Sequence, residues 1–155
     1  MKVNIEERVQ SARNYFLEGY NCSQAVLLAY HDITSLNKEL AATIAAPFGG
    51  GMGRMREVCG TVSAMSMLAG FRYPVVDTLD QEARTRNYAI VQKMGSLFKE
   101  EFGTIICREL LPPTEASQTS PTPSIRNAAY YSSRPCGHYV AKAAEIAGKM
   151  LKGEL

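Results

Sequence analysis

Four cysteines carry the chemistry that this 155-residue chain could perform, namely Cys22, Cys59, Cys107 and Cys136. A thiolate is both the nucleophile of disulfide exchange and a ligand for metal ions. The wide spacing of the four contains no Cys-x-x-Cys pair, which is the usual sequence signature of a zinc site or a thioredoxin-like motif. In a reducing compartment stable disulfides are rare, so the cysteines are free and packed, metal-bound or redox-active.

The start of the chain and its charge predict a cytoplasmic protein. The first ten residues, MKVNIEERVQ, lack the apolar stretch of a secretory signal. No apolar run approaches the roughly 20 residues that a membrane helix needs, so we expect no membrane insertion. A formal net charge of +2 provides no basic surface that would favour nucleic acid as a partner. The sequence leaves the oligomeric state open.

The elements that must position the cysteines are helices. Apolar residues recur at helical spacing, and no convincing alternating strand or repeat interrupts them. We therefore predict an all-α fold, a compact single helical domain over residues 1–155 with about five to seven helices and short connections. The polar, turn-rich segment 112–124, PPTEASQTSPTPS, is expected to be a surface loop. Helix starts are expected after Asn4, near Asn21, after Ser35, at Cys59, at Asp77 or Thr78, at Thr104 and around Ser133 and Pro135.

Each cysteine falls in or beside the first turn of an expected helix. Unpaired N–H groups and the helix dipole favour an anion there, so a first-turn cysteine is expected to have a lowered pKa. Arginines close in sequence would add positive charge, and these are Arg54, Arg56, Arg108 and Arg134. A shared placement of all four cysteines predicts that they act together in one site.

A glycine-rich stretch, FGGGMGR at residues 48–54, immediately precedes Cys59. Glycine is kept where the backbone needs positive φ or close approach, so the stretch predicts a sharp turn that delivers Cys59 to a helix start. With two arginines nearby, Cys59 is the expected attacking thiolate, and it should alkylate faster than the other three cysteines.

The order of these motifs resembles a known family. GYNCSQAVL, FGGGMGR followed by CGTVSAMSMLAG, IICREL and RPCGHYV are similar, over residues 15–146, to the C_GCAxxG_C_C family of proteins labelled redox-active. The resemblance implies that the family's four cysteines fall on Cys22, Cys59, Cys107 and Cys136. The resemblance also implies that the family's Cys-Gly-Ala-x-x-Gly motif begins at Cys59-Gly60. Two positions depart from that motif, because Thr61 stands in place of alanine and Ala64 in place of glycine.

Three hypotheses follow for the function. The first is a thiol redox protein, a candidate thiol oxidoreductase, in which Cys59 attacks and Cys22, Cys107 or Cys136 resolves; its partner would be a redox protein or a small thiol. Four cysteines allow three pairings, and the sequence does not choose among them. The second is a metal or iron–sulfur protein in which the four cysteines hold zinc or a [2Fe–2S] cluster. The third is a structural module with inert cysteines.

Overall fold

The structure, a computed structural model, describes residues 2–155, and Met1 lies outside the described part. Within it the chain folds into α-helices joined by turns and loops, so the predicted all-α fold is confirmed. Five elements of eight residues or more form the framework: α1 (Ile5–Leu17), α3 (Lys38–Ala45), α4 (Gly60–Arg72), α5 (Gln81–Phe102) and α9 (Cys136–Leu151). The shorter elements are α2 (Cys22–Leu28), the 3₁₀ helix η1 (Ala46–Phe48), α6 (Cys107–Leu110), α7 (Pro113–Ala116) and α8 (Ala128–Ser133).

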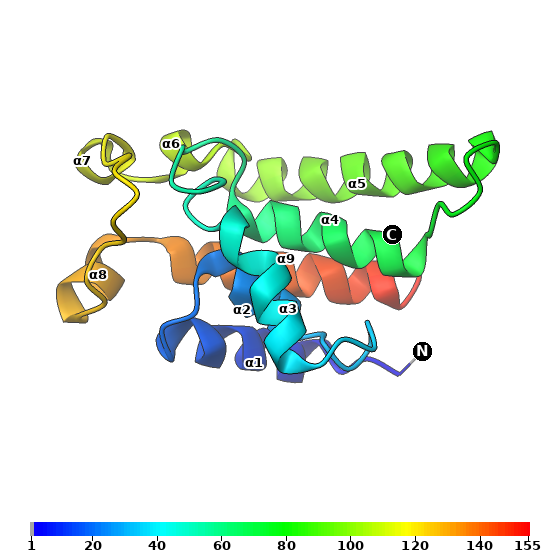
Figure 1. Ribbon diagram of the computed structural model, residues 1–155, viewed down its shortest axis with the longest axis horizontal. Coiled ribbons are helices and arrows are strands. Elements are labelled where there is room, and N and C mark those ends of the chain that lie inside the picture. Colours follow the sequence, from blue (N-terminus) through cyan, green and yellow to red (C-terminus); the bar gives the residue numbers. More distant parts are fainter. Residues whose placement is uncertain (1) are drawn as a thin grey trace.

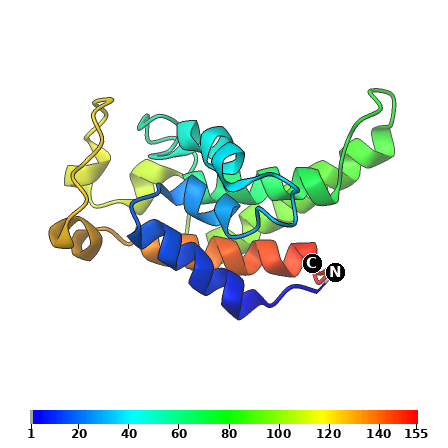
Figure 2. The ribbon, with the colours of Figure 1, turned by 60° about the horizontal axis from the view of Figure 1, so that its bottom comes forward.

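Helix α9 is the centre of the bundle, because it packs against α1, α2, α4 and α5. Figure 1 shows that α4 and α9 both begin at the end of the molecule where α6, α7 and α8 gather, while α1 and α5 run in the opposite direction and end there. Both termini lie toward the other end of the bundle (Figures 1 and 2). The starts of several helices therefore meet at one end of the bundle.

Side-chain caps explain where several helices begin. Asn4 caps α1 by accepting a hydrogen bond from the Glu7 N–H, as predicted. Asn21 and Gln24 form a full capping box at α2, in which each side chain bonds the other residue's backbone N–H. Such caps satisfy N–H groups that would otherwise lack partners. The residues that fix these helix starts are therefore close to them in the sequence.

Several expected boundaries were wrong. The long helix α5 is capped by Asp80, whose side chain accepts from the Ala83 N–H, and not by Asp77 or Thr78. The segment 112–124 contains the short helix α7, and α8 follows it where no helix was expected. These two elements are only four and six residues long. Helices of this length carry too little periodicity to be seen in a sequence.

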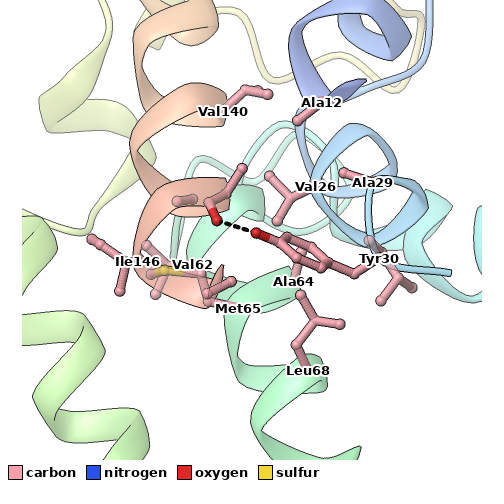
Figure 3. Packing of buried hydrophobic residues seen from close by; sticks show 14 of the residues in the cluster. Ala12, Val26, Ala29, Tyr30, Val62, Ala64, Met65, Leu68, Val140 and Ile146 are labelled. Carbon is pink, nitrogen blue, oxygen red and sulfur yellow. Dashed lines mark hydrogen bonds between the residues drawn. The ribbon is translucent and has the colours of Figure 1, made fainter. Parts of the chain in front are cut away.

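Tyr30 joins α2, α4 and α9 in the core. Its side chain is fully buried, and its hydroxyl donates to the Ala144 carbonyl of α9 at 2.6 Å. Figure 3 shows the ring among Val26, Ala64, Met65 and other apolar side chains, with this bond drawn as a dashed line. A buried hydroxyl needs such a partner, because an unsatisfied one costs free energy.

We expect Tyr30→Phe to lower the free energy of unfolding by about 1–2 kcal/mol, because it leaves the buried Ala144 carbonyl without this donor. Urea denaturation followed by circular dichroism measures the difference. Tyr88→Phe, an exposed tyrosine on α5, is the control and should be neutral. Equal stabilities for the two variants would contradict this account of the core.

Candidate functional site

All four cysteines line a single cavity of about 380 Å³ at the end of the bundle where the helix starts meet. Cys22, Cys107 and Cys136 are the first residues of α2, α6 and α9, and Cys59 is the residue immediately before α4. The predicted first-turn placement is therefore confirmed for all four. A scattered arrangement, with each cysteine in separate apolar packing, is excluded by the shared cavity.

A short backbone pairing brings Cys59 and Cys107 to the same place. Val58 and Ile106 form an isolated antiparallel bridge between segments far apart in the sequence. The Cys59 N–H donates to the Ile105 carbonyl at 2.8 Å, and the Cys107 N–H donates to the Glu57 carbonyl at 2.6 Å. Each cysteine therefore has its backbone fixed by the segment that carries the other.

The glycine-rich stretch forms a left-handed turn. Residues 50–54 all have positive φ, from 57° to 69°, and Arg56 does too. Glycine adopts this conformation at little cost, whereas each non-glycine residue costs about 1–2 kcal/mol. Gly51 is also needed for space, since a Cβ there would lie 2.6 Å from the Cβ of Cys107. The predicted sharp turn is confirmed, and it touches Cys107 directly.

The turn directs Arg54 and Arg56 toward the segment 112–124. Arg56 donates from Nε and Nη2 to the Gln118 carbonyl at 3.2 and 2.9 Å. Arg54 donates from Nε to the Ser120 carbonyl at 2.7 Å and from Nη1 to the Ser124 hydroxyl at 3.3 Å. The segment is therefore more than a surface loop, because its backbone fixes two cavity-lining arginines.

Cys59 does not have the chemistry expected of it. Its side chain is 5% exposed, and its sulfur lies 3.1 Å from the hydroxyl of Thr61. Burial raises the pKa of Cys59 strongly, and the charge of Cys22 raises it further. The prediction of an easily ionised Cys59 was therefore wrong. Desolvation of a charged sulfur outweighs the favourable helix end at this position.

Burial also raises the pKa of the two half-buried thiols, Cys22 and Cys136. Burial raises the pKa of Cys22, with the backbone N–H of Gly50 opposing the shift. Burial raises the pKa of Cys136 to about 12, and the charge of Cys22 adds to the effect. A negative charge on Cys22 raises the pKa of both Cys59 and Cys136. Ionisation of several thiols in the cavity at the same time is therefore unfavourable.

Cys107 is the cysteine that contacts a cation. Nη1 of Arg56 donates to the Cys107 sulfur at 3.8 Å, and the Arg56 side chain is only 2% exposed. Arg108, expected to support Cys107, instead pairs with Glu57 at 2.6 Å on the surface. Contact with a guanidinium favours the thiolate form of a cysteine. An arginine beside Cys107 was therefore correctly expected, but the sequence indicated Arg108, whereas in the structure it is Arg56.

Two further arginines, Arg126 and Arg134, complete the cavity wall beside Tyr130. Their guanidinium carbons lie 4.4 and 4.6 Å from the centre of the Tyr130 ring. Arg134 was expected from its position before Cys136, and it also donates to the Ser124 hydroxyl at 3.1 Å. Arg126 and Tyr130 were missed, and no motif marks them, because they follow the polar segment and come close only in the fold.

The hypothesis of a metal centre finds no matching arrangement. Within residues 2–155 no group of three or more His, Cys, Asp or Glu side chains is arranged to hold a metal ion. The shared cavity places the four thiols in one site, but a zinc or iron–sulfur centre needs them around one point. The geometry of the donors therefore does not fit that group.

We expect the protein to lose stability as pH rises above about 8.5, where thiols of an unfolded chain ionise. The folded pKa of Cys59 is raised, so the folded state keeps a proton that the unfolded state releases. Stability falls in that window by up to about 1.4 kcal/mol per pH unit for this thiol. Urea denaturation under reducing conditions at pH 8, 9 and 10 should show a steeper fall for wild type than for Cys59→Ala. Parallel curves would contradict the raised pKa.

Comparison with known proteins agrees with these features. The model of the family described as "Putative redox-active protein (C_GCAxxG_C_C)" matches residues 20–150. No curated protein and no solved structure matches the chain. Where the family motif has alanine, this chain has Thr61, whose hydroxyl contacts the Cys59 sulfur.

The described residues contain no helix with the length and apolar character needed to cross a bilayer.

Proposed function

Because this chain belongs to the family described as "Putative redox-active protein (C_GCAxxG_C_C)", we propose that it performs thiol–disulfide exchange with cysteines of the shared cavity. The observation that carries the proposal is the contact between Arg56 and the sulfur of Cys107 in a cavity that holds three more thiols. A guanidinium beside one thiol, with further thiols in the same cavity, is an arrangement that disulfide exchange can use.

In the proposed reaction Cys107 attacks. Its thiolate bonds to one sulfur of a substrate disulfide, the substrate S–S bond breaks, and the departing thiolate takes up a proton. Arg56 stabilises the negative charge on Cys107 before attack. This assignment replaces Cys59, because burial raises the pKa of its thiol.

Cys22 is the proposed resolving cysteine. The two cysteines contact neighbouring residues of the glycine-rich turn, because the backbone N–H of Gly50 bonds Cys22 and a Cβ at Gly51 would lie 2.6 Å from the Cβ of Cys107. Once Cys22 loses its proton, its sulfur attacks Cys107 and displaces the second substrate thiolate. The protein then holds a Cys22–Cys107 disulfide, and two electrons and two protons have passed to the two product thiols. Cys59 and Cys136 remain proposed redox residues of the same cavity.

The test uses the fully reduced protein and bis(2-hydroxyethyl) disulfide, which is uncharged. We expect two of the four thiols to disappear first, and peptide mapping should join Cys22 to Cys107. Cys107→Ser should stop the loss, whereas Cys22→Ser should accumulate a mixed disulfide on Cys107. Four thiols that persist in the native protein but react after unfolding would contradict the proposal and favour inert cysteines.

A further inference from the structure

The cavity wall is strongly cationic. Its charged lining residues are all arginines, Arg54, Arg56, Arg126 and Arg134, with no aspartate or glutamate among the residues that line it. None of the four forms an ion pair with a carboxylate within residues 2–155. A concave site lined by one sign of charge concentrates ligands of the opposite sign.

The arginines act on one another as well. Burial lowers the pKa of Arg54, and the charges of Arg56 and Arg134 lower it further. Apart from the contact between Arg56 and the Cys107 sulfur, their hydrogen-bond partners are neutral oxygens, namely the Gln118 and Ser120 carbonyls and the Ser124 hydroxyl. These partners hold the side chains in place without neutralising them. The repulsion that remains would be relieved by a bound anion.

Arg126 points to a direct contact with that anion. Its guanidinium carbon lies beside the rings of Phe16 and Tyr130, at 4.9 and 4.4 Å from their centres. The Nη1 atom is buried and has no hydrogen-bond partner in the protein. A buried N–H group without an acceptor is costly, so this donor is suited to an oxygen supplied by a ligand.

We propose that the substrate of the cavity is a small disulfide that carries carboxylate groups, bound through Arg126 and attracted by the other three arginines. This inference rests on the proposed thiol–disulfide exchange and adds the class of substrate. A volume of about 380 Å³ lies in the range of small-molecule sites. The reduced protein transfers two electrons to the anionic disulfide, whose S–S bond breaks to give two anionic thiols, while two cysteines of the protein form a disulfide.

Three disulfides of similar length test the charge preference. These are 3,3′-dithiodipropionate with two carboxylates, bis(2-hydroxyethyl) disulfide without charge, and cystamine with two ammonium groups. Each rate of protein oxidation is divided by the rate with 2-mercaptoethanol, which corrects for the intrinsic reactivity of each disulfide. We expect the anionic compound to exceed the neutral one by at least about ten-fold at low salt, and cystamine to be slowest. The preference should shrink as ionic strength rises.

Arg126→Gln should slow the reaction with the anionic disulfide far more than the reaction with the neutral disulfide, so that most of this preference is lost. Arg86→Gln is the matched control, since Arg86 is exposed on α5 beside Glu82 and far from the lining. An unchanged order of rates in Arg126→Gln, or equal rates for the three compounds in wild type, would overturn the inference.

A ligand that cannot react separates this inference from the proposed function. Suberate has the length of dithiodipropionate, with a CH₂–CH₂ group in place of the disulfide. We expect calorimetry to show suberate binding to the reduced wild type and much weaker binding to Arg126→Gln. Binding of suberate without reaction of any disulfide would show an anion site and refute the redox function. If the three disulfides reacted at rates that did not follow their charge, and suberate did not bind, the redox function would stand and the proposal of an anionic substrate would be refuted.

Discussion

Gly60→Ala is expected to destabilise the protein by about 1–3 kcal/mol, the usual cost of overpacking. A Cβ at Gly60 would lie 2.6 Å from the Phe48 carbonyl oxygen and 2.7 Å from the Cys22 sulfur. One of these neighbours is backbone, so the clash cannot be relieved by rotating a side chain. The glycine that follows Cys59 in the family motif is thus explained by close approach of Cys22 to the start of α4.

Gly70→Ala is the matched control for this substitution, because Gly70 lies in the same helix and a Cβ there would meet nothing within 4 Å. It should raise stability by up to about 1 kcal/mol through helix propensity. Urea denaturation followed by circular dichroism should therefore show changes of opposite sign in the free energy of unfolding for the two glycine-to-alanine substitutions. Two stabilising effects would mean that Cys22 does not pack against Gly60.

Arg56→Gln is expected to slow the alkylation of Cys107 by about ten-fold near neutral pH, because the amide keeps a donor but removes the positive charge that contacts the reacting sulfur. In wild type, Cys107 should be the first of the four cysteines to react with iodoacetamide, since burial raises the pKa of Cys22, Cys59 and Cys136. Mass spectrometry of the alkylated peptides gives the rate at each cysteine separately.

Two further variants make this result specific. Arg56→Lys keeps the charge and should retain most of the reactivity of Cys107. Arg54→Gln is the control, because Arg54 is held by the same segment but forms no hydrogen bond with a cysteine. If Cys59 reacted first in wild type, or if Arg54→Gln slowed Cys107 as strongly as Arg56→Gln, the assignment of Cys107 would be wrong.

Much of the fold could be predicted because its signals are local. Asn4 and Asn21 cap helices through their own neighbours, and the stripes of apolar residues along α5 and α9 are regular enough to define those helices. Asp80 was missed because Asp77, Thr78 and Asp80 are all good caps, and the sequence does not rank them. Helix α8 was missed because six residues show no period.

The sequence by itself determined that the chain is all-α and that its four cysteines stand at helix starts, since capping and helical period depend on residues a few positions apart. Only the tertiary structure decided which arginine contacts which cysteine sulfur. Arg56 contacts Cys107, 51 positions away, and Arg126 joins the wall without any motif. The same long-range packing buries Cys59, and burial is what reverses the direction of its pKa. A thiol's charge state depends on all the atoms that exclude water from it, and those come from segments that only folding brings together.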